Sequence, residues 1–368
     1  MTEPLLDVRD LAVQFEIYKG RQWVLDGVDL TVDEGETVAL VGESGCGKSV
    51  TAETILGTLP QPPGEIVNGE VRYRGRNLLK NSDDDQIHSE EMNMIFQDPM
   101  SHLSPVFTVE SMMRDVIKYR GREPSWWELL RELIGRSSED HEQIRDQCID
   151  MFEKLQIPDP EGVLDRYPVE LSGGMRQRVL IAMALITEPD FLIADEPTTA
   201  LDVTVQDQII EILSERIEEQ NLSVLYITHN LGVARKLADR IYVMYAGNIA
   251  ESGPTDELFE APLHPYTRGL LDTIPKLTDF DSTGIPGRIP DYHDPPSGCR
   301  FHPRCPAYIE GECEQASPDP VSVAGDHNVS CYLYEDGLDV ETASATADRE
   351  IVYDDESAER FEDDPERR

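Results

Sequence analysis

A glycine-rich stretch from Val38 to Val50 carries the residue types that bind a phosphate chain. Its sequence, VALVGESGCGKSV, meets the spacing G-x-x-x-x-G-K-S and adds a central glycine. Glycines leave backbone N–H groups uncovered, so phosphates can lie against them, while Lys48 supplies a charge to the β- and γ-phosphates. The hydroxyl of Ser49 is a ligand for Mg²⁺. The residues of this predicted nucleoside triphosphate site are Gly42, Glu43, Ser44, Gly45, Cys46, Gly47, Lys48, Ser49 and Val50.

Two acids and a histidine follow buried strands that we predict later in the chain. The apolar run Phe191 to Ala194 leads into Asp195 and Glu196, and the run 223–227 is followed after one residue by His229. Ligands of open α/β sheets lie beyond the carboxyl ends of the strands, so we expect these side chains to converge on the phosphates. Strand-end capping is the alternative for the two acids, and an intact phosphate loop in the same chain disfavours it.

The segment LSGGMRQR, residues 171–178, predicts a second anion site. Ser172, Gly173 and Gly174 precede a helix that we expect to begin at about Met175. A serine and two glycines at a helix N-terminus expose N–H groups to an anion, and the helix dipole favours negative charge there.

The elements that position these residues are an α/β core and an edge sheet. Val38 to Val41 is a β-branched buried strand, and Ser49 to Thr58 is the helix after the phosphate loop. Leu5 to Ile17 and Val28 to Val32 alternate apolar and polar residues, which predicts an antiparallel edge sheet, and Gly64 to Tyr73 predicts a further strand.

An aromatic residue between the two edge strands is a candidate for stacking on a nucleotide base. Tyr18 lies in the predicted loop, and Phe15 and Trp23 are its rivals. Ordinary packing is the alternative for each of them.

Composition restricts the class of protein. The 368 residues include 39% hydrophobic residues, enough for a core, but no run approaches the roughly 18 apolar residues of a membrane span. The start of the chain lacks the basic and apolar regions of a secretory signal, so we expect a cytoplasmic location. The formal net charge of −41 argues against nucleic acid as a partner. Because only seven of the 32 basic residues are lysine, we also predict a halophilic source.

From about Thr255 the chain becomes rich in glycine and proline, helical periodicity fades, and four cysteines appear: Cys299, Cys305, Cys313 and Cys331. We interpret residues 255–335 as a loop-rich extension and the acidic segment 336–368 as a disordered tail. The spacing C-x5-C-x7-C-x17-C lacks the C-x2-C pair of common zinc and ferredoxin sites. Cys46 and Cys148 are expected to be packing residues.

With these motifs in order, the chain resembles the ATP-binding subunits of ABC transporters. The resemblance adds a Q-loop glutamine at Gln97 and a D-loop at 200–202, and it covers roughly residues 5–334. The segments HPYTRGLL (264–271) and PPSGCRFHPRCP (295–306) are similar to the C-terminal extension of the oligopeptide/dipeptide/nickel importers. The implied fold is an α/β P-loop NTPase of the ABC ATPase type at 1–254, with a helical subdomain at about 98–180 and the extension at 255–335.

The resemblance also implies roles for the candidate residues. Glu196 would be the general base, His229 would hold the attacking water, and Lys48 would contact the phosphates. Ser49, Gln97 and Asp195 would hold Mg²⁺ and its waters. In a dimer that encloses two ATP molecules, Ser172, Gly173 and Gly174 would serve the partner's site, and Asp202 would join the two sites.

The resemblance implies partners and a metal centre as well. The partners are a second ATPase subunit, which in this subfamily is a non-identical paralogue, two permease subunits and a solute-binding protein. Some members of the subfamily carry a 4Fe–4S iron–sulfur cluster on the extension, so we predict such a cluster at the four cysteines; zinc, free thiols and disulfides are the alternatives.

The resulting prediction is the ATP-hydrolysing subunit of an importer for oligopeptides or dipeptides, at the cytoplasmic face of the membrane. The alternatives are an importer for nickel or sugars, a soluble ABC ATPase unconnected with transport, and a module that senses ATP without hydrolysing it. One phosphate loop and no coiled-coil insertion disfavour the soluble ATPase, and Glu196 with His229 disfavours the sensor.

Overall fold

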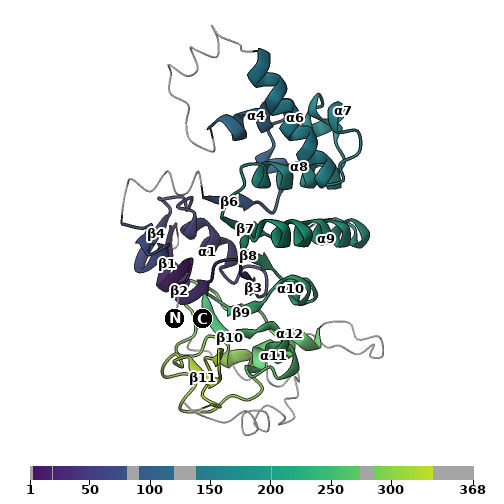
Figure 1. Cartoon of the computed structure of the whole chain (residues 1–368). Coiled ribbons are helices and arrows are strands. Elements are labelled where there is room, and N and C mark those ends of the chain that lie inside the picture. The colour runs from purple at the N-terminus through teal and green to yellow at the C-terminus, as the bar shows by residue number, and fades with distance from the viewer. Residues whose placement is uncertain are drawn as a thin grey trace. The chain divides into compact units, whose positions relative to one another are not determined.

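The computed structural model describes residues 3–18, 20–80, 91–119, 138–199, 201–273 and 285–334. The chain divides into two units, the first made of Met1–Leu79 with Tyr226–Arg368 and the second of Lys80–Leu225. The division falls within strand β8 (Ser223–Thr228) (Figure 1). The predicted acidic tail at 336–368 lies outside the described residues. The predicted domain boundary at 254 remains a prediction.

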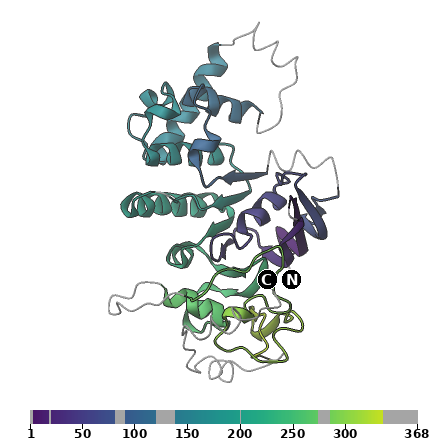
Figure 2. The same ribbon diagram turned by 180° about the vertical axis from the view of Figure 1, so that it is seen from behind.

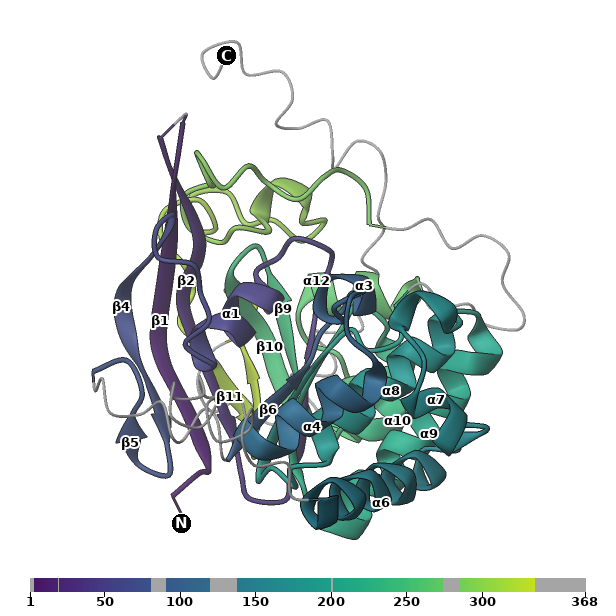
Figure 3. The same cartoon turned by 90° about the horizontal axis from the view of Figure 1, so that it is seen from above.

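The first unit contains the antiparallel edge sheet that the sequence predicts. Its strand order is β2-β1-β4-β5, with β1 at Leu6–Ile17, β2 at Gly20–Val32, β4 at Gly64–Tyr73 and β5 at Arg76–Asn77. Figure 3 shows β2, β1 and β4 side by side. The second strand begins at Gly20, well before the predicted Val28, because 20–27 pairs with the end of β1 although its residues do not alternate cleanly.

A second group of strands in the first unit includes the strand that leads into the phosphate loop. Strand β3 (Thr37–Val41) is buried along its whole length and pairs in parallel with β9 (Arg240–Tyr245). Strand β10 (Asn248–Pro254) pairs antiparallel with β9. A strand that is buried on both faces is a nearly continuous apolar run, which explains the residues VALV at 38–41.

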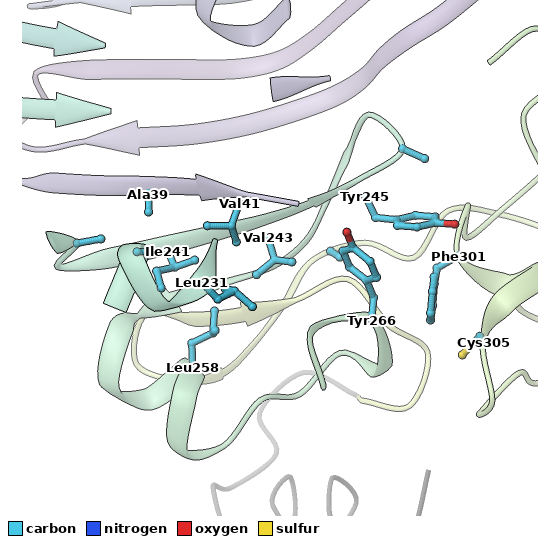
Figure 4. Packing of buried hydrophobic residues seen from close by; sticks show 14 residues of the cluster. Ala39, Val41, Leu231, Ile241, Val243, Tyr245, Leu258, Tyr266, Phe301 and Cys305 are labelled. Carbon is cyan, nitrogen blue, oxygen red and sulfur yellow. The ribbon is translucent and has the colours of Figure 1, made fainter. Parts of the chain in front are cut away.

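The C-terminal extension adds strands and helices to this unit. β12 (His327–Val329) pairs with β10, and β11 (Val321–Ala324) pairs with β12. Helices α11 (Thr255–Glu260) and α12 (Pro265–Asp272) begin the extension, so the predicted fading of helical structure at Thr255 is wrong for its first 18 residues. Figure 4 shows the core that joins α10 (Leu231–Leu237), β3, β9 and the extension.

The second unit is mostly helical. Strand β6 (Met92–Ile95) pairs in parallel with β7 (Phe191–Asp195), and Ile95 lies opposite Ala194. Its helices are α3 (Pro99–His102), α4 (Val109–Tyr119), α6 (Ser138–Lys154), α7 (Pro160–Leu164), α8 (Gly173–Leu185) and α9 (Val203–Gln220), with a 3-10 turn at Pro168–Glu170. Helices α4, α6, α7 and α8 lie together in the view from behind in Figure 2 as they do in Figure 1.

An arginine on α6 links three of these elements. Arg145 Nη1 lies 2.6 Å from a carboxylate oxygen of Glu110 on α4 and 3.1 Å from one of Asp165, which follows α7. The two ion pairs join the middle of α6 to the first turn of α4 and to the C-terminal end of α7. Within the described ranges, every helix is too short or too polar to cross a lipid bilayer.

A buried carboxylate organises the start of the extension. Glu251 on β10 is 1% exposed and accepts hydrogen bonds from the backbone N–H groups of Leu263 and His264, both at 2.8 Å. The same carboxylate lies 2.8 Å from Nε2 of His327 on β12. The ring of His264 caps α12 by accepting from the N–H of Tyr266. Burial lowers the pKa of His264 to about 4, and the Glu251 carboxylate opposes this shift only in part.

This histidine predicts acid sensitivity. The unfolded chain binds a proton at the ordinary pKa of 6.5, whereas the folded chain binds it only near 4. The contribution to stability is therefore complete above pH 6.5 and is lost as the pH falls toward 4, by about 1.4 kcal/mol per pKa unit. In His264→Asn, which keeps a capping oxygen, the free energy of unfolding should fall less between pH 7 and pH 4.5 than in the wild type. Identical pH profiles for the two proteins would contradict this assignment.

Candidate nucleotide site

The phosphate loop, Gly42–Ser49, connects β3 to α1 (Lys48–Ile55) in the first unit. A Cβ atom at Gly42 would lie 2.2 Å from the backbone oxygen of Met244, so a side chain has no space there. Gly47, the N-cap of α1, has a φ of 113°, which favours glycine, and its Cβ would meet Leu25 at 2.7 Å. Two of the motif glycines are therefore required by the fold of the loop itself.

The ammonium group of Lys48 lies inside the curve of this loop. It donates to the backbone oxygens of Gly42 at 2.8 Å and of Glu43 at 3.0 Å, and its residue is 5% exposed. Ser44 and Ser49 are exposed beside it, so their hydroxyl groups face solvent at the loop. Burial raises the pKa of the Cys46 thiol, with Lys48 only partly offsetting the effect, and Cys46 is a protonated packing residue as expected.

The three aromatic candidates for base stacking differ in how exposed they are. Tyr18 is fully exposed after β1, so its ring is available for stacking. Phe15 is half-buried in β1, and Trp23 is half-buried in β2, where the backbone N–H of Trp23 donates to the backbone oxygen of Tyr292. In the same unit His229 is exposed directly after β8.

The second unit holds the candidate base. Glu196 follows β7, is 9% exposed and has a φ of 42°, an uncommon left-handed conformation for a residue with a side chain. Its Oε2 accepts from Nε2 of Gln97 at 3.0 Å and from Oγ1 of Thr199 at 2.8 Å. The parallel register of β6 and β7 places Gln97 and Glu196 at the same edge. Asp195, the last residue of β7, is 5% exposed.

Thr199 is a residue that the sequence analysis missed. Its position three residues after Glu196 is the only signal, and a threonine in a turn is not distinctive by itself. Strained backbone commonly marks functional sites, and here two donors hold the strained residue's carboxylate.

The LSGG segment and the residues after 200 meet in the second unit. Ser172 is the N-cap of α8 and accepts from the N–H of Met175, so the helix begins at Gly173, two residues before the predicted start. A Cβ on Gly173 would have ordinary contact with Leu201 at 3.7 Å, whereas one on Gly174 would lie 3.0 Å from Val205. Asp202 caps α9 by accepting from the N–H of Val205. Ala200 lies outside the described residues.

Three residues of the extension contact the phosphate loop and were not expected there. An oxygen of the Glu43 carboxylate lies 2.7 Å from Arg304, the N–H of Glu43 donates to the hydroxyl of Tyr266, and Tyr292 donates to the backbone oxygen of Gly45. The extension and the loop are more than 220 residues apart in sequence, so no local spacing could indicate these contacts.

The prediction of a metal centre at the four cysteines is wrong. Among the described residues no group of three or more His, Cys, Asp or Glu side chains is placed to hold a metal ion. The four thiols line a cavity of about 10 Å³, space for one water at most. Burial raises the pKa of Cys299 to about 11 and that of Cys331 to about 12, so both thiols are protonated near neutral pH. All six cysteines are free thiols.

Comparison with known proteins identifies the family of this chain. The chain matches the family described as ABC transporter over residues 25–199 and the oligopeptide/dipeptide transporter C-terminal region over residues 250–313. It is 41% identical to the dipeptide transport ATP-binding protein DppD of Bacillus subtilis, over 90% of this chain and 96% of that protein. It is also 41% identical to OppD, the oligopeptide transport ATP-binding protein of the same organism, over 89% of this chain and 88% of that protein.

Solved structures give the same answer. The dimeric structure of MJ0796, described as a bacterial ABC transporter cassette, matches with a TM-score of 0.55 and 26% identity over 68% of this chain and 98% of that one. The structure of the same protein in a post-hydrolysis state bound to ADP and Pi matches equally well. The chain therefore belongs to the ABC transporter family of ATP-binding proteins, in its oligopeptide/dipeptide branch. The predicted P-loop NTPase fold is confirmed.

The prediction of a halophilic source is wrong on these findings. Relatives come from Bacillus subtilis and Sinorhizobium fredii, and no comparison supports such a source. An acidic composition governs solubility and self-repulsion, which are properties of the chain and do not identify the organism.

The contacts of the LSGG glycines predict that one of them is dispensable for folding. Gly173→Ala meets only ordinary contacts and improves helix propensity, so the free energy of unfolding should be unchanged or raised by up to about 1 kcal/mol. The ATPase rate of the assembled transporter should nevertheless fall, because the new methyl group stands where an anion would approach the helix N-terminus. Thermal unfolding and phosphate release measure the two effects. An unchanged ATPase rate would remove Gly173 from the site.

Proposed function

We propose that this chain is the ATP-hydrolysing subunit of an ABC importer for peptides and that it works as a peripheral protein at the cytoplasmic face of the membrane. The phosphate loop is the observation that carries the proposal, because Gly42 and Gly47 leave no space for side chains and Lys48 lies within the loop, which supports the binding of a triphosphate. Peptide transport follows from relatives that cover about nine-tenths of the chain and carry the same C-terminal region. These relatives support peptides over nickel, sugars or a soluble ATPase.

The nucleotide is ATP with Mg²⁺. Lys48 contributes its charge to the phosphates, and the exposed hydroxyl of Ser49 at the first turn of α1 is a ligand for the metal. Asp195 and Gln97 organise Mg²⁺ and its waters. Tyr18 stacks on the base, which its full exposure allows. When bound, Mg²⁺ neutralises charge on the transferred phosphoryl group.

Hydrolysis depends on Glu196 as the general base. Gln97 and Thr199 both donate to its Oε2, which holds the carboxylate in one orientation, and the carboxylate accepts a proton from the attacking water. His229, exposed at the end of β8, holds the water and the γ-phosphate. The protein's contribution is mostly positioning and charge stabilisation.

The assembly has two ATP sites. Ser172, Gly173 and Gly174 present the N-terminus of α8, which is exposed at Ser172 and Gly173, to the nucleotide of a partner ATPase. Asp202 joins the two sites. That partner is a related, non-identical subunit, and two permeases and a solute-binding protein complete the importer.

The base assignment predicts a separation of binding from hydrolysis. Glu196→Gln keeps an oxygen that can accept from Gln97 and Thr199, but the amide cannot take a proton from water. The hydrolysis rate of the assembled complex should therefore fall by roughly 10²–10⁴, while MgATP affinity stays within about twofold. Lys48→Ala should instead lose MgATP affinity. Phosphate release and calorimetric titration measure the two quantities.

Glu211→Gln on the exposed face of α9 is the control, and it should behave as the wild type. Hydrolysis by Glu196→Gln at the wild-type rate would refute the assignment of the base.

A further inference from the structure

Three side chains of the C-terminal extension hold the phosphate loop from outside. The guanidinium of Arg304 meets both oxygens of the Glu43 carboxylate, at 2.7 and 3.2 Å. The hydroxyl of Tyr266 accepts from the N–H of Glu43 at 2.9 Å, and the hydroxyl of Tyr292 donates to the backbone oxygen of Gly45 at 2.6 Å. The loop is thus held at one side chain and at two backbone groups.

Contacts outside the phosphate loop also hold the Arg304 side chain in place. It is 4% exposed, and its Nε and Nη2 donate to the backbone oxygens of Pro286 and Ile285. Nη1 also donates to the hydroxyl of Tyr245, whose ring lies 5.7 Å from the guanidinium carbon. Burial alone would lower the pKa of Arg304, but Glu43 and Tyr245 outweigh it and the pKa is raised. A guanidinium held this way offers Glu43 a two-pronged partner of fixed orientation.

The two tyrosines fix the backbone on either side of Ser44. The bond from the N–H of Glu43 sets the plane of the peptide between Gly42 and Glu43, and the bond to the oxygen of Gly45 sets the plane of the peptide between Gly45 and Cys46. Each trans peptide is planar, so fixing one of its polar groups also fixes the direction of the other. Phosphates are bound by backbone N–H groups of this loop, and their directions decide affinity.

The extension is anchored well enough to act as a brace. The rings of Tyr245 and Tyr266 pack edge to face with centroids 4.7 Å apart, and Phe301 contacts both. These rings continue the core of β3 and β9, as Figure 4 shows. The same packing that folds the extension therefore sets the positions of the groups that touch the loop.

From these contacts we infer that Arg304, Tyr266 and Tyr292 are positioning residues for ATP, which hold the phosphate loop in its binding conformation. The extension then contributes directly to nucleotide affinity. The inference rests on the proposed function only in that the loop binds MgATP. A purely structural role, in which the contacts stabilise the extension alone, makes a different prediction.

Tyr292→Phe tests the inference by removing one oxygen atom. Loss of the bond to Gly45 should weaken MgATP binding by about fivefold, the equivalent of one hydrogen bond of about 1 kcal/mol. In the assembled transporter KM for ATP should rise by a similar factor while kcat stays within about twofold. Calorimetric titration of the full chain with MgATP measures the affinity.

Tyr334→Phe is the matched control. Tyr334 is likewise a tyrosine of the extension whose hydroxyl donates to a backbone oxygen, that of Leu263; it is buried, whereas Tyr292 is half-buried. Tyr334→Phe should lower the unfolding temperature at least as much as Tyr292→Phe and leave MgATP affinity unchanged. The inference would be overturned if both variants bound MgATP as tightly as the wild type, or if both lost the same MgATP affinity.

A double-mutant cycle tests the ion pair. Glu43→Gln and Arg304→Gln should each weaken MgATP binding, and the double variant should lose less than the product of the two factors, because each change removes the same interaction. Additive losses would contradict the inference, and Tyr292→Phe still decides it if Arg304→Gln does not fold. A wild type that fails to bind MgATP would instead refute the proposed function.

Discussion

The contact between the phosphate loop and the end of β9 is the constraint on which the first unit depends. Gly42 lies against the backbone oxygen of Met244 with no space for a side chain, and the N–H of Gly247 donates to the backbone oxygen of Cys46. The loop therefore takes its shape from the strand beside it as well as from its own glycines. The two residues after Met244 accept hydrogen bonds from the extension: Ala246 from Arg300 and Tyr245 from Arg304. The end of this strand therefore contacts both the phosphate loop and the extension.

The second unit has a different task, which is to hold a buried carboxylate in one orientation. Glu196 is bound through one oxygen by Gln97 and Thr199, and its left-handed backbone is an energetic cost that the surrounding turn must offset. Asp202 and Ser172 cap neighbouring helices with their own side chains. The phosphate cradle and the candidate base thus belong to different units, and the proposed ATPase needs both.

The sequence predicts what depends on local spacing. The phosphate loop, the strands before Glu196 and His229, and the edge sheet follow from short motifs and periodicity, and the structure has them, although β2 begins at Gly20 and not at the predicted Val28. The contacts of Arg304 and Tyr292 could not be predicted, because they join segments more than 240 residues apart. The prediction of a metal centre was wrong for a related reason: the spacing of four cysteines in one segment does not show whether the fold leaves space for a metal between their sulfur atoms.

Transport of peptide driven by ATP is the central claim, and uptake into vesicles tests it most directly. The chain would be reconstituted with the partner ATPase, permeases and solute-binding protein of the proposed importer in vesicles that present the ATPase subunits outward, with a labelled dipeptide and the binding protein inside. Addition of MgATP should drive the peptide out of the vesicles, and Lys48→Ala or a non-hydrolysable analogue should prevent this. Retention of the peptide despite steady ATP hydrolysis by the wild type would contradict the account.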